Sequence, residues 1–353
     1  MNGALEGIKV LDLTTLLPGP LATLYLAEAG ADVLKIERPG GEDLRRYPPF
    51  RNGRSIAFEL LNKGKRFLEL DLKLADALAS MRALIEDADI LVEQFRPGVM
   101  ARLGLDYETL QELNPGLIMC SISGFGQTGP RAREAGHDIN YMGLTGLLEL
   151  SRGPAADPVL PPTQIADIGG GSFPAIINIL LALIQRARTG RGAYLDIAMC
   201  DAMFTFAPFA FADLAAAGRA PASGAMLLTG ASPRYGLYPT LDDRLVAVGA
   251  LEDKFWTGLC DAVGLAADLR DDGCDPAATK TGLAHCIRAR TAEDWRPVFA
   301  AADCCVTIVR DLRDALDDDH FRQRGLFDAQ LDLETGDPAT ALPLPIAKAL
   351  RKT

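Results

Sequence analysis

Residues 8–37 read IKVLDLTTLLPGPLATLYLAEAGADVLKIE, which is an apolar run, a helical pattern and a second apolar run. The runs Ile8–Leu13 and Asp32–Glu37 are short, and each predicts a strand. The segment between them predicts a helix from about Pro18 to Ala29. A strand, a helix and a second strand in this order predict two parallel strands joined by a right-handed crossover.

The same alternation continues through the first half of the chain. Further strands are expected at Arg66–Asp71, Asp89–Val92, Gly116–Ile122 and Ala193–Ala198, with an amphipathic helix between the first two. This alternation is typical of an α/β fold with a parallel sheet, whose ligands bind at the carboxyl ends of the strands. The turn after Leu13 reads TTLLPGP instead of GxGxxG, and the chain has no GxxxxGK[ST] motif, so a nicotinamide dehydrogenase is not expected.

After about Cys200 the pattern changes. An apolar, Ala-rich helix is expected over 201–218, and residues 221–230 are small and flexible, as in a linker. The next segments predict a hairpin of strands at 235–240 and 245–250, helices at about 252–263, 279–290 and 292–302, and a strand at 304–310. These elements form a smaller α+β domain.

The composition is typical of a soluble globular protein, with 48% hydrophobic and 24% charged residues. The net charge of −11 argues against nucleic acid as the main partner. The first residues, MNGALEGIKVLDL, lack the features of a signal peptide, and no apolar run reaches the roughly 20 residues of a membrane span, so no membrane partner is expected. Seven scattered cysteines without a CxxC pair indicate reduced thiols and a cytoplasmic location.

Residues 161–192 predict a helix with a prepared N-terminus. They read PPTQIADIGGGSFPAIINILLALIQRARTGRG, with Asp167 at the expected N-cap and Gly190 at the expected C-cap. The apolar residues that recur at helical spacing are Phe173, Ile176, Ile177, Leu180, Leu181 and Ile184. Gly169, Gly170 and Gly171 fill the first turn, although a glycine there costs about 1 kcal/mol.

Those three glycines have two interpretations. Without side chains, they would let a ligand reach the free amides at the helix start, so that Asp167 acts as a base or nucleophile beside oxyanion donors. The alternative is a capping aspartate followed by a turn that packs closely. The residues alone leave both open.

Two polar segments carry further candidates. Residues 38–66 contain eight Arg or Lys residues, a local basic excess that indicates an anion site, and Arg38 is the best candidate because it directly follows a strand. Residues 123–141 predict a loop, and His137 lies in it at the expected start of a helix. Histidines titrate near neutrality and exchange protons at modest cost, although a structural role for His137 is the alternative.

Taken together, these stretches resemble the family III CoA-transferase superfamily (CaiB/BaiF-like), and within it the α-methylacyl-CoA racemases. The resemblance covers nearly the whole chain and includes GIKVLDL, PGPLATLYLAEAGADVLKIERPGG, DILVEQFRPGVMARLGL, GFGQTGPRAREAGHDINY, ADIGGGS, TGRGAYLDIAMCDA and VAVGALEDKFW. The run GHDINY, residues 136–141, is similar to the racemase branch. The chain differs from racemases at Leu228–Pro233, where they have an LDGGAP-like run, and in DCCVTIVR, which lacks their proline.

The resemblance implies an interlocked homodimer in which two ring-like chains pass through each other. It also implies a Rossmann-like large CoA-binding domain over 1–200, completed by about 325–353, then a linker helix and loop over 201–230 and a small α+β domain over 231–324. The active site would lie between the large domain of one chain and the small domain of the other.

The site residues implied by the resemblance are carried over position by position. His137 and Asp167 match the racemase acid/base pair, and Glu252 matches a small-domain glutamate near the site. The positions expected to line the CoA site are Arg38, Leu70, Asp71, Leu72, Lys73, Gln94, Phe95, Arg96, Arg102, Gly136, Asp138 and Tyr141. The substrate would be an acyl-CoA thioester, and no metal or cofactor is required beyond the CoA of that substrate.

Two reactions fit these residues. The predicted one is epimerisation of a 2-methylacyl-CoA, in which Asp167 and His137 act on opposite faces of an enolate whose oxygen is held by the amides of Gly169–Gly171. In the alternative, a CoA-transferase, Asp167 attacks the acyl-CoA, forms an acyl-aspartyl anhydride and passes CoA to a second acid. Epimerisation is preferred because it uses His137, which the nucleophilic route does not need. A non-enzymatic acyl-CoA-binding or scaffold protein is a third interpretation.

Overall fold

The computed structural model describes residues 3–333 and 338–352, and the chain divides into two compact units. Unit 1 comprises Met1–Leu147, Pro161–Phe206 and Gln323–Thr353, and unit 2 comprises Leu148–Leu160 and Ala207–Arg322. Residues 148–160 therefore group with unit 2, although the large domain was expected to include them, and the N–H of Gly224 donates to the carbonyl of Leu150 there. The parts of the expected large domain at 1–2, 334–337 and 353 lie outside the described residues.

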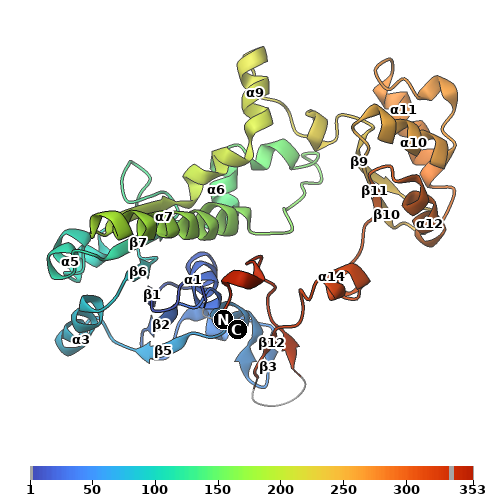
Figure 1. Ribbon diagram of the computed structural model, residues 1–353. Coiled ribbons are helices and arrows are strands. Elements are labelled where there is room, and N and C mark those ends of the chain that lie inside the picture. Colours follow the sequence, from blue (N-terminus) through green and yellow to red (C-terminus); the bar gives the residue numbers. More distant parts are fainter. Residues whose placement is uncertain (1–2, 334–337, 353) are drawn as a thin grey trace. The chain divides into compact units, whose positions relative to one another are not determined.

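Unit 1 is built on a six-stranded sheet in which every neighbouring pair is parallel, as predicted (Figure 1). Its order is β5-β2-β1-β6-β7-β8, with bounds β1 Lys9–Leu13, β2 Asp32–Glu37, β5 Arg66–Glu69, β6 Ile90–Glu93, β7 Ile118–Ser123 and β8 Ala193–Ala198. The chain runs outward from β1 to one edge and then returns to build the other half beside it, which is the order of doubly wound dinucleotide-binding folds. Such a sheet has its ligand crevice where the winding reverses, here between β1 and β6.

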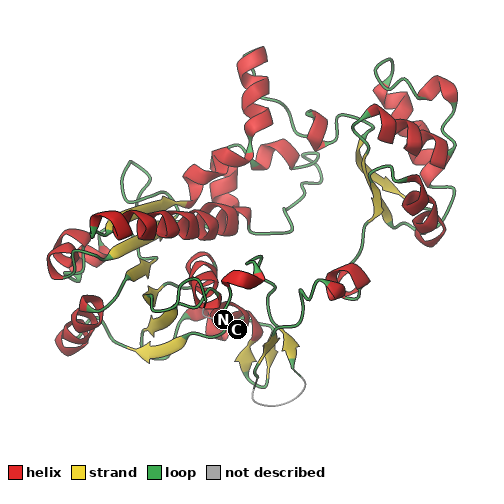
Figure 2. Ribbon diagram, in the orientation of Figure 1, coloured by secondary structure: helices red, strands yellow, loops and turns green. Residues whose placement is uncertain are grey.

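Helices cover both faces of this sheet (Figure 2). Leu11, Leu34 and Leu91 on one face pack in a common cluster with side chains of α3 (Ala75–Glu86), α4 (Val99–Arg102) and α5 (Tyr107–Leu113). The other helices in contact with the sheet are α1 (Pro18–Glu28) and α7 (Phe173–Thr189), which also pack against each other. Burial on both faces explains why the inner strands β6 and β7 read as nearly continuous apolar runs, whereas the edge strand β5 is largely exposed and the edge strand β8 is partly exposed.

The helix predicted over 161–192 forms, but it starts differently from the prediction. Ala166–Ser172 is a π-helical segment that leads into α7, and its N-cap is Ile165. The prediction that Asp167 is the N-cap was therefore wrong. The capping oxygen belongs to Asp138, whose Oδ1 accepts the N–H groups of Ala166 at 2.6 Å and Asp167 at 3.0 Å. Gly190 ends the helix in the left-handed conformation, as predicted.

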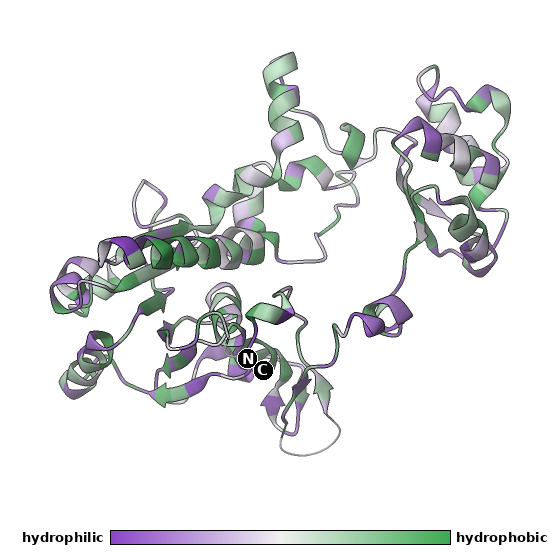
Figure 3. Cartoon of the chain, viewed as in Figure 1, coloured by the Kyte–Doolittle hydropathy of each residue, from purple (hydrophilic) through white to green (hydrophobic). Residues whose placement is uncertain are grey.

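One side of α7 is apolar and exposed, and the ribbon of Figure 3 is green along most of this helix. Ala175, Ile179 and Ala182 are buried, whereas Ile177 and Leu181 are 57% and 58% exposed. By length and composition alone, Ala166–Thr189 is able to cross a membrane, a test that core helices of soluble proteins also pass. The expectation that no segment is long and apolar enough for this was wrong, and the absence of a membrane partner stays a prediction.

Unit 2 contains an antiparallel sheet in the order β11-β10-β9, with bounds β9 Tyr235–Pro239, β10 Leu245–Gly249 and β11 Val306–Ile308. The predicted hairpin is therefore confirmed. Trp256, Trp295 and Phe299 belong to its core, and the helices that supply most of the rest are α10 (Asp253–Val263), α11 (Pro276–Ile287) and α12 (Ala292–Ala302).

The helix expected over 201–218 is interrupted. The segment consists of α8 (Met199–Ala202), a 3-10 turn at Met203–Phe206 and α9 (Pro208–Ala217). Pro208 has no N–H to continue a helix from the preceding turn, and it occupies the first turn of α9 instead.

The remaining elements are short. In unit 1 they are β3 (Phe50–Arg51), β4 (Arg54–Ser55), α2 (Ile56–Asn62), α6 (Asp138–Leu144), β12 (Gln330–Leu331), β13 (Ala339–Thr340) and 3-10 turns at Asp43–Arg46 and Lys348–Leu350. The others are α13 (Leu312–Leu316), α14 (Asp319–Gln323) and 3-10 turns at Leu148–Ser151, Leu227–Thr229 and Ala267–Leu269. All seven cysteines lie within the described residues and are free thiols, and the cytoplasmic location stays a prediction.

Candidate active site

Two cavities lie at the carboxyl ends of the strands of unit 1, where the winding of the sheet reverses. Thr15, in the turn after β1, and Phe95, just after β6, line both of them. Gln94 closes the crevice between these strands, because its Oε1 accepts the N–H of Gly19 at 3.0 Å. The two cavities therefore share a wall at the place where doubly wound sheets bind their ligands.

The acid–base cavity, as we call the one lined by His137 and Asp167, has a volume of about 500 Å³. It unites residues from the ends of β1, β6 and β7, from the loop before α6 and from the π-helical segment. The predicted site residues that line it are Gln94, Phe95, Arg96, Gly136, His137, Tyr141 and Asp167. The structure thus brings together a histidine and an aspartate that are thirty residues apart in the sequence.

The carboxyl group of Asp167 holds its proton more tightly than an ordinary aspartate does. Burial raises the pKa of this carboxyl to about 6, the neighbouring Asp138 carboxylate adds to the rise, and His137 opposes it. A carboxyl with a pKa near 6 exchanges its proton readily close to neutral pH, which suits a general acid or base. Asp167 can therefore both accept and return a proton under ordinary conditions.

The backbone of His137 is fixed by two hydrogen bonds with Asn140. Its N–H donates to Oδ1 of Asn140 at 3.0 Å, and its carbonyl accepts the N–H of Asn140 at 2.8 Å, which starts α6. The hydroxyl of Tyr141 donates to the carbonyl of Gly136 at 2.6 Å, and a side chain at Gly124 or Gly136 would collide with the Tyr141 ring. This packing fixes the path of the chain through His137 and leaves its imidazole available to the cavity.

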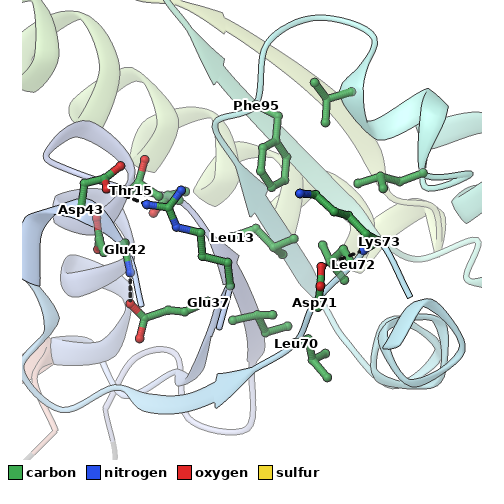
Figure 4. Close-up of a pocket in the computed structure, with 15 residues that line it drawn as sticks. Leu13, Thr15, Glu37, Glu42, Asp43, Leu70, Asp71, Leu72, Lys73 and Phe95 are labelled. Atoms are coloured by element: carbon green, nitrogen blue, oxygen red, sulfur yellow. Dashed lines mark hydrogen bonds and ion pairs between the residues drawn. The ribbon is translucent and has the colours of Figure 1, made fainter. Parts of the chain in front are cut away.

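The second cavity has a volume of about 400 Å³ and is lined by a second group of residues that were predicted to bind CoA. Arg38, Leu70, Asp71, Leu72, Lys73 and Phe95, all predicted, line it. Figure 4 shows Glu37, Glu42 and Asp43 along one side and Asp71, Lys73 and Phe95 along the other. Arg38 pairs with Asp43 at 2.6 Å, so a bound anion would have to share or replace that carboxylate.

Six predicted positions are not among the residues that line these two cavities: Gly169, Gly170 and Gly171, which are taken up below, and Arg102, Asp138 and Glu252. Arg102 is exposed on α4 between the lining residues Val99 and Leu103. Asp138 is not among the residues that line either of these two cavities, and its carboxylate accepts hydrogen bonds from the amides at the start of the π-helical segment. Glu252 is the N-cap residue of α10 in unit 2, whereas the other site residues belong to unit 1, so its catalytic role stays a prediction.

The three glycines after Asp167 are explained by close packing. A Cβ on Gly170 would lie 2.5 Å from the carbonyl oxygen of Met199, and one on Gly169 would lie 2.5 Å from the Phe206 ring. Gly171 approaches Pro18 in the same way. The sequence left packing and ligand access open, and the structure supplies the packing reason. An oxyanion role for these amides stays a prediction.

Several residues of the site were not predicted from the sequence. Thr15 and Leu16 line the acid–base cavity from the turn TTLLPGP, and the available signal was its position between the first strand and the first helix of the sheet. Glu93, at the end of β6, is 2% exposed, and its burial raises its pKa to about 7. Its Oε2 accepts the N–H of Phe95 at 2.6 Å, so it fixes the wall that both cavities share.

Comparison with known proteins identifies the family of the chain. The model of CoA-transferase family III matches residues 5–350. Human α-methylacyl-CoA racemase is 36% identical over 327 residues, which cover 92% of this chain and 82% of the relative. Acetyl-CoA:oxalate CoA-transferase of Acetobacter aceti is 35% identical over 324 residues, covering 89% and 82%. The crystal structure of a CaiB/BaiF family protein from Brucella suis superposes with a TM-score of 0.85 at 31% identity, covering 98% of this chain and 93% of the other.

Proposed function

The chain belongs to CoA-transferase family III, and from this premise we propose that it epimerises 2-methylacyl-CoA thioesters by proton transfer at the α-carbon. The observation that carries the proposal is that His137 and Asp167 line one cavity, with the pKa of Asp167 at about 6. A racemase of human origin is among the similar proteins, although transferases match equally well. The family alone therefore leaves the reaction open, and the pair of proton-exchanging groups decides our choice.

The mechanism follows from the weak acidity of the α-proton of a thioester. Its removal requires a base and a polar group that holds the enolate oxygen as negative charge develops. In our proposal, ionised Asp167 takes the proton from one face of the α-carbon, and protonated His137 delivers a proton to the other face of the planar enolate. The reverse assignment converts the other epimer. Each turnover removes one proton to Asp167 and adds a different one from His137, leaves the thioester bond intact, and requires both groups to exchange protons with solvent before the same direction repeats.

Asp138 supports this chemistry from behind. Its carboxylate fixes the amide of Asp167 and raises the pKa of the Asp167 carboxyl. Asp138 is therefore a positioning residue in the proposal, and it replaces the predicted direct contact with CoA.

The second candidate is a CoA-transferase, which is favoured by the same Asp167 and by the relative from Acetobacter aceti. Asp167 would attack the thioester carbonyl to give an acyl-aspartyl anhydride and CoA thiolate, and the thiolate would attack the aspartyl carbonyl, which releases the donor acid and leaves an aspartyl-CoA thioester. An incoming carboxylate would displace CoA from that thioester to form a second anhydride, and the thiolate would take the new acyl group and free Asp167. This route needs ionised Asp167 but leaves His137 without a proton to move.

We further propose that acyl-CoA binds with its CoA part in the second cavity and that the active protein is a homodimer in the cytoplasm. Arg38 and Lys73 supply positive charge to that cavity for the phosphates. The exposed apolar side of α7 supports a dimer in which a second copy of the chain packs against it, because soluble proteins rarely expose large apolar surfaces to solvent. Interlocking and the entry of Glu252 into the site remain what the family resemblance implies.

The decisive experiment incubates the protein with a 2-methylacyl-CoA in D₂O without any acceptor acid. Epimerisation predicts deuterium at the α-carbon and loss of stereochemical purity, and both His137→Ala and Asp167→Asn should abolish most of the conversion. Transfer predicts no α-exchange, trapping of the acyl group on Asp167 by hydroxylamine, and little effect of His137→Ala. Acid-dependent CoA transfer without α-exchange across short, long and aryl 2-methylacyl chains would refute the proposal.

A further inference from the structure

The turn after β1 holds a leucine in a conformation that leucine avoids. Leu16 has a φ of 63°, in the left-handed region. Residues other than glycine, asparagine and aspartate rarely adopt this conformation, and for a bulky apolar residue it is a true outlier that strains the backbone. Such strain persists only where the surroundings impose it, and it concentrates at functional sites.

Two buried side chains impose this conformation from either side of Thr15. The N–H of Leu16 donates to Glu42 Oε2 at 2.7 Å, and Lys35 Nζ donates to the carbonyl of Thr14 at 2.7 Å. Lys35 and Glu42 also pair with each other, Nζ to Oε1, at 3.1 Å. Lys35 has 0% exposure and Glu42 has 2%, so water does not weaken these contacts.

This ion pair is anchored by a second one. Asp12 Oδ1 accepts the N–H of Thr14 at 2.9 Å, and Asp12 Oδ2 pairs with Lys65 Nζ at 3.0 Å. Asp12 Oδ1 also lies 4.0 Å from Lys35 Nζ. Three of these contacts fix the backbone of Thr14 or Leu16, and the Thr14 hydroxyl donates to Asp12 Oδ1 at 2.5 Å as well.

The turn so fixed forms part of the reaction chamber. Leu16 and Thr15 line the acid–base cavity together with His137 and Asp167, and Leu16 contributes the apolar surface. Burying two opposite charges is expensive and adds little stability over apolar residues of similar volume, so a buried pair is better explained by the geometry that it specifies. Here that geometry is the position of Leu16, which lines the cavity that also contains His137 and Asp167 and packs partly against the cluster of Leu21, Leu44 and Phe58.

We propose that the buried Lys35–Glu42 pair is a positioning device that holds Leu16 in the left-handed conformation, and that Leu16 thereby limits the size of the acyl group beside the α-carbon. The inference rests on the proposed acyl-CoA chemistry of the same cavity. Glu42 does not touch the reacting atoms and acts only through Leu16.

The test compares Glu42→Gln, Leu16→Gly and the double variant. Glutamine has one acceptor oxygen where glutamate has two, so it cannot serve the N–H of Leu16 and Lys35 together. Glycine adopts a positive φ without strain, so it needs no such support. The fall in the urea midpoint of unfolding that Glu42→Gln causes should therefore shrink by about half in the Leu16→Gly background, a coupling typical of residues in contact.

A second readout separates positioning from mere stability. We measure the ratio of kcat/KM for two 2-methylacyl-CoA thioesters that differ only in chain bulk next to the α-carbon. Leu16→Gly and Glu42→Gln should each shift this ratio toward the bulkier substrate by about tenfold, as expected when an apolar pocket wall moves. Glu59→Gln on α2, which weakens the part-buried pair of Glu59 with Arg54 of β4, is the matched control and should leave the ratio unchanged.

The outcomes are distinct. Additive effects on the urea midpoint would overturn the claim that Glu42 acts through Leu16. An unchanged substrate ratio in Glu42→Gln, despite lower stability, would overturn the role in selectivity. If the unaltered protein turns over neither thioester, the proposed function fails, and the unfolding measurements still decide whether the ion pair holds Leu16.

Discussion

Asp167→Asn should stabilise the protein at neutral pH while removing its activity. The pKa of Asp167 is raised from 3.8 to about 6, so the folded protein binds this proton more tightly than the unfolded chain does. Between these two pH values the folded state loses stability as pH rises, because ionising Asp167 costs more in the cavity than in water. An asparagine side chain does not ionise, so the folded Asp167→Asn variant does not lose stability in this way as pH rises.

The size of the effect follows from the same pKa. A rise of about two pH units corresponds to about 3 kcal/mol at about 1.4 kcal/mol each. Asp167 is only partly buried, so water reduces this figure, and we expect a gain of about 1–2 kcal/mol at pH 7. Below pH 4 the carboxyl is protonated in both states, and the gain should disappear.

Urea unfolding of both proteins at a series of pH values from 3.5 to about 8 measures this directly. The midpoint difference should grow between pH 4 and about 6 and then stay constant. Asp201→Asn, at an exposed position on α8, controls for the change of residue type. A pH-independent difference, or a loss of stability at pH 7, would show that Asp167 does not sit in the unfavourable environment that its proposed role requires.

Three further predictions concern other parts of unit 1. Lys73→Ala should weaken CoA binding by about 1–2 kcal/mol in calorimetry, and Arg102→Ala should weaken it less, because only Lys73 lines the cavity; a larger effect of Arg102 would restore the direct contact that the resemblance implies. Lys65→Met should lower the free energy of unfolding by about 3–5 kcal/mol in urea, since it removes the cation nearest to the buried carboxylate of Asp12. Leu181→Asp should convert a dimer to monomers in light scattering if α7 forms the interface, and an unchanged mass would place the interface elsewhere.

The parallel sheet was predictable because most of its strands are short apolar-rich runs separated by helical segments and turns. Ile8–Leu13 and Asp32–Glu37 could be recognised without any tertiary contact, and the helix between them followed from its spacing. The break before Pro208 was harder to predict. The Ala-rich apolar composition of the segment favours a continuous helix, and only the single proline opposes it.

The site was predictable as residue types but not as an arrangement. His137 and Asp167 stood out as a histidine and an aspartate in loops and helix starts, yet their placement in one cavity depends on the winding of the sheet. The capping role of Asp138 was hidden, because its partners, the amides of Ala166 and Asp167, lie far along the chain. The strained Leu16 could not be foreseen, since nothing in TTLLPGP reports a positive φ at a leucine.

The wall shared by the two cavities has a consequence for inhibitor design. Thr15 and Phe95 line both cavities. A fragment bound in one cavity therefore fixes the conformation of side chains that a fragment in the other cavity also contacts. A nucleotide-like fragment and an acyl-like fragment would then bind with a coupling free energy, and by reciprocity each changes the affinity of the other by the same factor. Fragment affinities measured separately would misjudge a linked compound, and the rotamer of Phe95 is the variable that a chemist would need to control.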